Sequence, residues 1–238
     1  MGTLYIVATP IGNLKDITLR ALEVLDKTEI IACEDTRRTG LLLSSIRHSG
    51  KPMAHPESEN NKPTLLSYFE QNELKRIPQI LNALHNGIDV ALVSDAGTPT
   101  ISDPGFKLVR ECVKEGIKVE SIPGPSSTIT ALVVSGLPTD KFLFLGFLPQ
   151  KPGHRKKLLR NVLDSQKFVK STVILFESPH KLITTLSEIK EIFGDIDIVI
   201  ARELTKIHEE IRREKISKSI GHFQKTNPKG EFVILFHL

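Results

Sequence analysis

The sequence predicts an α/β protein made of two α/β domains with mostly parallel sheets. Three observations support this fold class. Short apolar runs rich in β-branched residues recur along the chain, segments with a hydrophobic period near 3.6 lie between most of them, and 238 residues suffice for two domains of ordinary size. Runs without polar alternation, such as Val173–Phe176, are typical of parallel strands that crossover helices cover on both faces.

Eight strands are expected in chain order. They span Leu4–Ala8, Ile30–Cys33, Val90–Val93, Val119–Ile122, Phe142–Leu148, Val173–Phe176, Ile196–Ala201 and Phe232–Phe236. Helical periodicity follows the first strand, with a helix expected from Ile17 and Asp16 as its N-cap, and it recurs over residues 158–163. Residues 49–63 are crowded with Pro, Gly and Asn, which predicts a long loop.

The domain boundary is expected near the middle of the chain. Two prolines and a glycine, Pro123-Gly124-Pro125, directly follow the fourth expected strand. We therefore expect an N-terminal domain of residues 1–121 and a C-terminal domain of residues 122–238, with four strands in each. In the C-terminal domain, Arg212, Arg213, Lys215 and Lys218 follow two glutamates, which predicts a basic helix with a solvated face.

Composition excludes several classes of protein. Lys and Arg exceed Asp and Glu by four, a weak preference for anionic partners. The two cysteines lie far apart in the sequence and the eight histidines are scattered, so we expect neither a disulfide framework nor a metal site. A cytoplasmic location is expected. No run approaches the roughly 20 apolar residues of a membrane span. The chain also lacks the glycine-rich motifs of P-loop and dinucleotide-binding proteins and the G-x-S-x-G motif of hydrolases.

Small and polar residues gather where the expected strands end, which is where open parallel sheets bind ligands. Residues 9–14 include a glycine that lets a ligand approach the backbone, and residues 33–38 pair two carboxylates with two guanidinium groups. Residues 94–105 carry turn residues, hydroxyls and two aspartates along nearly their whole length. Further strand ends lie at residues 123–128, 176–180 and 201–206. Because these loops come from both halves of the chain, the site is expected in the cleft between the domains.

These motifs, in this order, closely resemble the 16S rRNA cytidine 2′-O-ribose methyltransferases, a branch of the tetrapyrrole methylase superfamily. The motifs are TPIGNL at residue 9, CEDTR at 33, SDAGTPTISDPG at 94, PGPS at 123, FESPH at 176 and ARELT at 201. The resemblance implies a class III (tetrapyrrole methylase-like) methyltransferase that uses S-adenosyl-L-methionine, works as a homodimer, and modifies the decoding region of 16S rRNA in the small ribosomal subunit.

The resemblance also implies which residues contact the cofactor, which lies in the interdomain cleft. They are Ile11, Gly12, Asp95, Ala96, Gly97, Ile101, Ser127, Thr128, Phe176 and Leu204, with the strand that begins at Glu231-Phe232. The family often carries a histidine- and asparagine-containing segment in its long loop, where this chain has residues 55–61. The alignment of His55 stays open.

Methylation of a ribose hydroxyl is helped by a general base, which contributes about 10²–10⁴-fold. We expect a carboxylate of Glu34, Asp35 or Glu203 in this role. Arg37 completes the expected catalytic set, and Arg37, Arg38 and Arg202 are expected to hold the RNA backbone.

Two other functions remain open at this point. A tetrapyrrole C-methyltransferase of the uroporphyrinogen or precorrin type shares the fold and the cofactor, although the motif from Cys33 to Arg37 and the positive charge balance favour RNA. A non-catalytic RNA-binding factor of ribosome assembly retains the fold without the chemistry. Binding of S-adenosylmethionine separates this factor from both enzymes.

Overall fold

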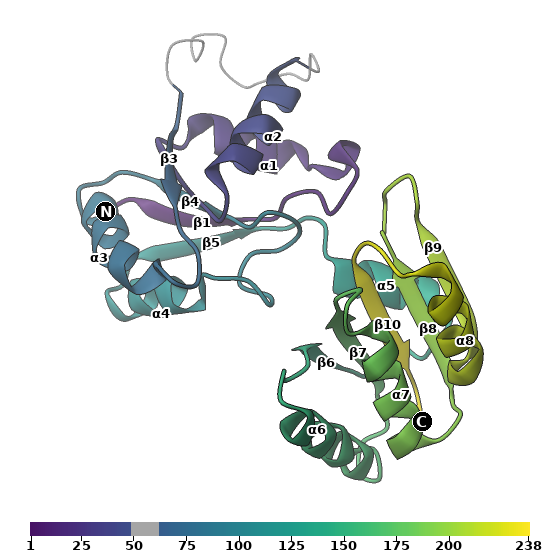
Figure 1. Cartoon of the computed structure of the whole chain (residues 1–238). Coiled ribbons are helices and arrows are strands. Elements are labelled where there is room, and N and C mark those ends of the chain that lie inside the picture. Colours follow the sequence, from purple (N-terminus) through teal and green to yellow (C-terminus); the bar gives the residue numbers. More distant parts are fainter. Residues whose placement is uncertain (49–61) are drawn as a thin grey trace. The chain divides into compact units, whose positions relative to one another are not determined.

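The computed structural model describes residues 1–48 and 62–238, which form two compact units, Met1–Ser126 and Ser127–Leu238 (Figure 1). The sequence-based boundary after residue 121 falls at the end of the last strand of the first unit. Most of the loop expected over residues 49–63, including His55, lies outside the described residues. Within the described part of the chain, no helix is long and apolar enough to span a membrane.

The first unit contains a five-stranded sheet in which all strands are parallel, as predicted. The strands are β1 (Thr3–Val7), β2 (Ile30–Cys33), β3 (Thr64–Ser67), β4 (Val90–Val93) and β5 (Lys118–Ile122), in the order β3-β2-β4-β1-β5. In the interior strand β1, Leu4 lies beside Val90 of β4 on one side and Val119 of β5 on the other. Strand β3 was not among the expected strands; it has only four residues and lies at the edge of the sheet.

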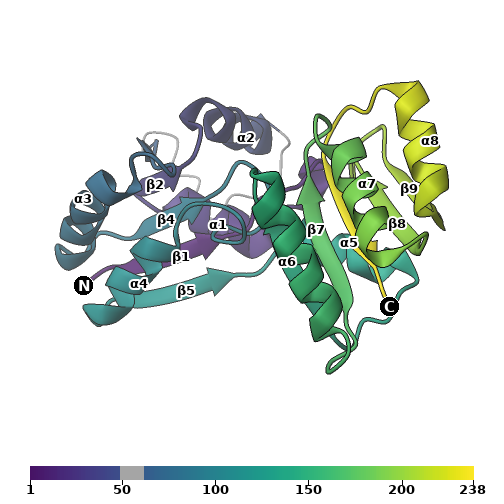
Figure 2. The same ribbon diagram turned by 60° about the horizontal axis from the view of Figure 1, so that its bottom comes forward.

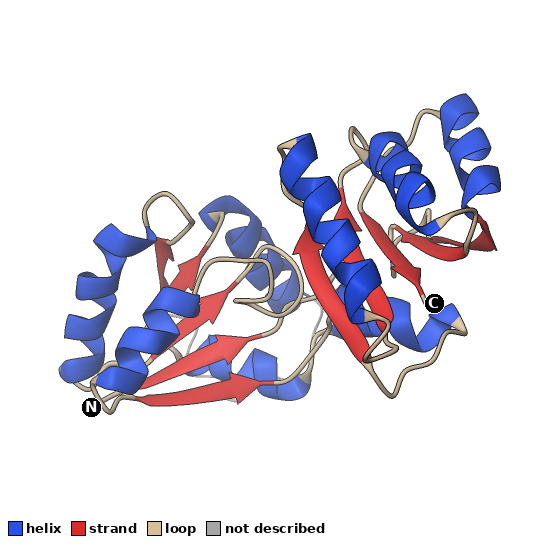
Figure 3. Ribbon diagram, turned by 90° about the horizontal axis from the view of Figure 1, so that it is seen from below, coloured by secondary structure: helices blue, strands red, loops and turns tan. Residues whose placement is uncertain are grey.

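Helices cover both faces of this sheet (Figure 3). They are α1 (Leu19–Lys27), α2 (Thr36–His48), α3 (Glu73–His85) and α4 (Phe106–Lys114). Successive strand residues point to opposite faces. Leu4 and Ile6 therefore pack with α3 and α4, whereas Val7 packs with α1. A strand that is buried on both faces needs apolar residues at nearly every position, which explains the continuous apolar runs in the sequence.

The start of α1 differs from the expectation. A 3₁₀ turn, η1 (Leu14–Asp16), precedes the helix, and the hydroxyl of Thr18 accepts a hydrogen bond from the N–H of Ala21 at 3.1 Å. The N-cap is therefore Thr18, and the prediction of Asp16 was wrong. Asp16 already belongs to the 3₁₀ turn, so its side chain precedes the first free N–H groups of the helix.

The second unit also has five strands, but its sheet is mixed. The strands are β6 (Phe142–Phe147), β7 (Thr172–Glu177), β8 (Asp197–Arg202), β9 (Glu210–Lys215) and β10 (Phe232–Phe236), in the order β6-β7-β10-β8-β9. Among neighbouring strands, only β6 and β7 pair in parallel; β10 is antiparallel to β7 and β8, and β9 is antiparallel to β8. The prediction of mostly parallel sheets was wrong here, because a central strand covered on both faces is apolar throughout in either direction.

Four helices cover this mixed sheet. They are α5 (Ser127–Ser135), α6 (Pro152–Ser165), α7 (Leu182–Phe193) and α8 (Ile216–Thr226). Figure 2 shows α6, α7 and α8 side by side along one face, and α5 contacts strands β7, β8 and β10. Leu159 of α6, Leu186 of α7 and Phe223 of α8 bury their side chains in one core with the strands.

Part of the expected basic helix is a strand. Residues 210–215 form the edge strand β9, and only residues from Ile216 onward are helical. Arg212 pairs with both Glu210 and Glu214 at 2.9 and 2.8 Å, so the three side chains share one face. Side chains two residues apart lie on the same face of a strand but not of a helix. The alternation of acidic and basic residues at this spacing is therefore typical of a strand.

Candidate active site

Three loops of the first unit meet beyond the carboxyl ends of β1, β4 and β5. Strands β1 and β4 are neighbours, but the helices that follow them, α1 and α4, pack on opposite faces. Such a divergence leaves a crevice at the carboxyl edge of the sheet, where α/β proteins bind ligands. The loops are residues 8–14, 94–105 and 123–126, called the loop cluster below.

Backbone hydrogen bonds join the first two loops of the cluster. Thr9 and Gly97 form an isolated antiparallel bridge, with N–H to O distances of 2.9 and 3.0 Å. The hydroxyl of Thr9 also donates to the carbonyl of Ser94 at 3.2 Å. These bonds hold the loop after β1 against the loop after β4.

Two glycines allow the loops to pack this closely. Gly97 has a φ of +84°, and a Cβ there would lie 3.3 Å from Cγ2 of Ile11. At Gly124 a Cβ would lie only 2.9 Å from the Cβ of Ala8. The Thr98 hydroxyl completes the cluster by donating to the carbonyl of Pro125 at 3.0 Å. A larger residue at Gly97 or Gly124 therefore requires the loops to move apart.

The loop after β4 contains strained backbone. Thr100 and Ser102 have φ values of +73° and +63°, in the left-handed region that residues other than Gly seldom occupy. Such residues cost about 1–3 kcal/mol each and concentrate at functional sites. The strain makes this loop a candidate part of a functional site.

Carboxylates from β2 and β4 are connected at this edge of the sheet. The carboxylate of Asp95 accepts a hydrogen bond from the N–H of Asp35 at 3.1 Å, and it pairs with the guanidinium of Arg38 at 3.2 Å. Arg37 binds the carboxylate of Asp35 through Nη2 and Nε, at 2.9 and 3.2 Å. The side chain of Arg37 is otherwise 88% exposed. The structure thus joins four of the expected site residues in one network.

The carboxyl groups of this region differ in pKa. Burial raises the pKa of Asp103 to about 6, and the charges of Glu34 and Asp95 add to this increase. Burial and the charge of Asp95 also raise the pKa of Glu34. In contrast, the hydrogen bonds from Arg37 lower the pKa of Asp35 to about 2. Pairs of carboxyl groups with separated pKa values are a common arrangement for acid–base chemistry.

The sequence analysis did not single out Asp103. It lay within the polar stretch 94–105, and its Asp-Pro-Gly context reads as an ordinary turn. Its raised pKa depends on partial burial and on Glu34, which is 69 residues away in the sequence. Among the described residues, no group of His, Cys, Asp or Glu has the arrangement of a metal site.

The second unit contributes its expected residues at strand and helix ends. Thr128 lies in the first turn of α5 with 5% of its surface exposed, and its buried hydroxyl oxygen has no hydrogen-bond partner among the described residues. Phe176 lies near the end of β7 and makes edge-on contacts with Phe144 and Phe147. Leu204 is buried after β8, and Ser127 begins α5.

The charged residues expected after β8 are engaged within the second unit. Glu203 accepts hydrogen bonds from Lys206 at 2.9 Å and from the N–H of Glu231 at 3.0 Å. Although burial raises its pKa, these bonds lower the pKa of Glu203 overall. Arg202 donates to the carbonyl of Lys229 at 2.6 Å and pairs with Glu210 at 3.3 Å. The side chains of Arg202 and Glu203 are 26% and 18% exposed, against 88% for Arg37, so both are less available to a substrate than Arg37.

Comparison with known proteins identifies the family. The family model of the Tetrapyrrole (Corrin/Porphyrin) Methylases matches residues 3–219. The chain is 48% identical over 235 residues to the ribosomal RNA small subunit methyltransferase I of Thermotoga maritima, covering 99% of this chain and 98% of that protein. The protein of the same name from a Hydrogenobaculum species is 48% identical over 233 residues, covering 98% and 94%.

Solved structures share the fold at low sequence identity. Cobalt precorrin-4 methyltransferase has a TM-score of 0.66 at 17% identity, covering 98% of this chain and 93% of that structure. Uroporphyrin-III C-methyltransferase from Thermus thermophilus, solved with S-adenosylhomocysteine, has a TM-score of 0.63 at 16% identity, covering 98% and 97%. The chain belongs to the tetrapyrrole methylase family and, within it, to the group of ribosomal RNA small subunit methyltransferase I proteins.

Proposed function

We propose that this protein transfers a methyl group from S-adenosylmethionine to the 2′-hydroxyl of a cytidine ribose in the decoding region of 16S rRNA. The 48% identity to two proteins named ribosomal RNA small subunit methyltransferase I, over nearly the full length of both, is the observation that carries the proposal. From the family resemblance alone, the proposal includes a cytoplasmic homodimer acting on the small ribosomal subunit.

The residues of the loop cluster fit this cofactor. The exposed Gly12 leaves backbone open to close approach, and Ile101, which is 45% exposed, offers an apolar surface for an adenine ring. Ile11, Asp95 and Ala96 complete the proposed contacts of the first unit. A carboxylate such as that of Asp95 suits a ligand that carries positive charge.

Residues of the second unit supply further proposed contacts. The buried hydroxyl of Thr128 has no hydrogen-bond partner in the described part of the chain, which costs about 1–3 kcal/mol unless a ligand supplies one. Ser127, Phe176 and Leu204 are the other proposed contacts. When bound, S-adenosylmethionine supplies an electrophilic methyl group.

The protein must still position the acceptor hydroxyl and accept its proton. Glu34 and Asp103 interact electrostatically and both have raised pKa values, so they form a coupled pair whose proton affinity lies closer to neutrality than that of an ordinary carboxylate. We propose that this pair accepts the proton as the ribose oxygen forms its bond to the methyl carbon. Asp35 and Glu203, whose pKa values are lowered, are weaker bases.

Positioning of the RNA is assigned to arginines. Arg37 and Arg38 present guanidinium groups that are mostly exposed beside the carboxylate network, where they are able to bind phosphates. Arg202 remains a proposed contact, but an RNA phosphate would have to compete with Glu210 for its guanidinium group.

The test is a reconstituted reaction. Purified protein, labelled S-adenosylmethionine and small ribosomal subunits from a strain that lacks this activity are incubated, and the rRNA is digested to nucleosides for mass spectrometry. We expect one labelled 2′-O-methylcytidine per subunit. A label on a nucleobase, or transfer only to uroporphyrinogen III in a parallel reaction, would contradict the proposal and favour a different family activity.

A further inference from the structure

One short segment of the second unit concentrates positive charge. Residues 151–170, which include α6, contain seven Lys or Arg residues and one Asp, a net charge of +6. The whole chain has a net charge of only +4, so all other residues together are slightly acidic. This segment therefore carries a large share of the positive charge that the composition shows.

Most of this charge is exposed and not neutralised. Arg155 is buried and pairs with Glu188, and Lys156 pairs with Glu191 at 2.6 Å. Lys167 pairs with Asp164, the only acidic residue of the segment. The four other cations lie on the surface and form no ion pair among the described residues; they are Lys151, Lys157, Arg160 and Lys170. Arg160 also helps to lower the pKa of Glu191 from a distance, after Lys156.

Helix α6 holds two of these cations, Lys157 and Arg160, at a fixed spacing. Leu159 and Val162 anchor one face of α6 in the core, and Arg155 is fixed beside them by its ion pair. Lys157 and Arg160 are three residues apart, so they are neighbours on the helix surface, separated by about 4.5 Å along the axis. Two neighbouring cations on a helix anchored in the core suit a partner with closely spaced negative charges.

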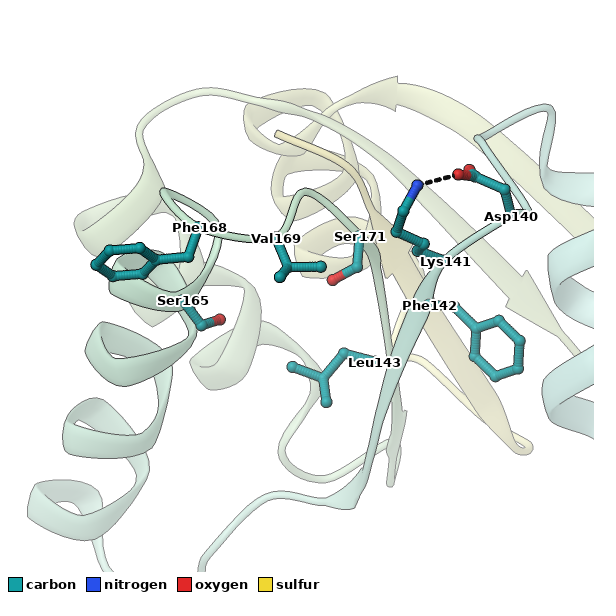
Figure 4. A pocket seen from close by; sticks show the side chains of 8 residues that line it. All are labelled: Asp140, Lys141, Phe142, Leu143, Ser165, Phe168, Val169 and Ser171. Carbon is teal, nitrogen blue, oxygen red and sulfur yellow. Dashed lines mark hydrogen bonds and ion pairs between the residues drawn. The ribbon is translucent and has the colours of Figure 1, made fainter.

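An exposed aromatic residue lies at the end of the same segment. Phe168 follows α6, lies between Lys167 and Lys170 in the sequence, and is 88% exposed. It borders a hollow of about 630 Å³ whose lining includes Leu143 and Val169 (Figure 4). An exposed aromatic ring beside cations is a typical stacking surface for an unpaired nucleobase.

We propose that Lys151, Lys157, Arg160, Phe168 and Lys170, called the α6 surface, bind the substrate RNA in addition to the contacts proposed for Arg37 and Arg38. The inference rests on the proposed function. A lipid surface fits less well, because a helix that binds a membrane inserts its apolar face, and the apolar face of α6 is buried in the core. An acidic protein partner would use the cations but would leave Phe168 without a specific role.

The test compares two double variants of equal charge change. Lys157→Gln with Arg160→Gln alters the α6 surface. Lys218→Gln with Lys225→Gln is the control, because both lysines are exposed, lie on helix α8 of the same unit and form no ion pair among the described residues. Glutamine preserves helix propensity, so both variants should fold, which circular dichroism checks.

Binding of each protein to small ribosomal subunits is measured by filter binding over a series of salt concentrations. Each phosphate contact contributes about 0.7–0.9 to the slope of log affinity against log salt, so the α6 variant should lose about 1.4–1.8 in slope and at least ten-fold in affinity at low salt. The control should stay within two-fold. Phe168→Ala should weaken binding about five-fold or more without changing the slope, because stacking is not ionic.

The outcomes separate the two proposals. If the wild-type protein methylates small subunits and the α6 variant binds like the control, only the α6 inference fails. If the wild-type protein neither binds nor methylates subunits, both fail. Binding of both proteins to vesicles with 30% phosphatidylserine is measured in parallel. If the α6 variant loses vesicle binding that the wild-type protein has, but keeps its RNA binding, the inference is overturned in favour of a membrane partner.

Discussion

Replacing Asp103 tests the proposed reaction, because an ionisable carboxyl group at this position is expected to assist methyl transfer but to destabilise the fold at neutral pH. Its pKa rises from 3.8 to about 6 in the folded protein, so the ionised form is disfavoured there. At 1.36 kcal/mol for each pKa unit, this shift corresponds to at most about 3 kcal/mol. Replacing Asp103 with Asn should therefore stabilise the protein at neutral pH while it slows methyl transfer.

The sign of the effect depends on pH. Below about pH 4 the carboxyl group is protonated in both the folded and unfolded states and contributes no difference. As the pH rises from about 4 to 6, the folded state binds more protons than the unfolded state, so the wild-type protein loses stability, and the loss is complete above about pH 6. The stability gained by Asp103→Asn should grow over this range and then remain constant. The side chain of Ser94 forms a hydrogen bond with the Asp103 carboxylate, and weakening this bond reduces the gain.

Thermal unfolding at pH 4 and pH 7.5 measures this difference. For a chain of this size, each kcal/mol corresponds to about 2–4 °C in Tm, so Asp103→Asn should unfold several degrees higher than wild type at pH 7.5 and at nearly the same temperature at pH 4. Asp35→Asn is the matched control with the opposite sign, because the pKa of Asp35 is lowered. An Asp103→Asn variant that is less stable than wild type at both pH values would refute the reasoning.

Three other substitutions test separate parts of the structure. Gly97→Ala should weaken S-adenosylmethionine binding in calorimetry and destabilise the first unit by about 1–3 kcal/mol. Gly116→Ala should cost less, because Gly116 has a similar positive φ but a Cβ there would meet no described atom within 4 Å; equal effects would contradict the close packing of the loop cluster. Thr128→Val should leave Tm unchanged or higher while cofactor affinity falls about two- to ten-fold; unchanged affinity would remove Thr128 from the site. Arg155→Met should cost about 3–5 kcal/mol in urea denaturation, and adding Glu188→Leu should restore most of it; no recovery would contradict a buried ion pair as the cause.

The sequence predicted the first unit well because its strands follow simple rules. Apolar strands alternate with helices there, and each connection returns the chain in a parallel direction, so the periodicity alone indicates the architecture. The second sheet shows the limit of this reasoning. The apolar run Phe232–Phe236 reveals that β10 is buried, but its direction depends on pairing with β7 and β8, which the local pattern does not encode.

Part of the candidate site could be predicted from the sequence because its residues follow apolar strands that the sequence reveals. Glu34, Asp35, Asp95 and Gly97 follow recognisable strands, so their position at the carboxyl edge follows from the topology. The raised pKa of Asp103 depends on contacts between distant segments, which a linear motif does not reveal. Likewise, the engagement of Glu203 by Lys206 and Glu231 becomes visible only once β8 and β10 are paired.

The central claim is that this protein methylates a ribose of 16S rRNA, and the most direct measurement is made on rRNA from cells. Small-subunit rRNA from a strain without the gene, and from the same strain complemented with the wild-type gene or with an allele carrying Glu34→Gln and Asp103→Asn, is digested and its nucleosides are quantified by mass spectrometry. We predict that one 2′-O-methylcytidine is lost in the deletion strain, restored by the wild-type gene and not restored to the same level by the double variant. An unchanged amount of 2′-O-methylcytidine in the deletion strain would contradict the account.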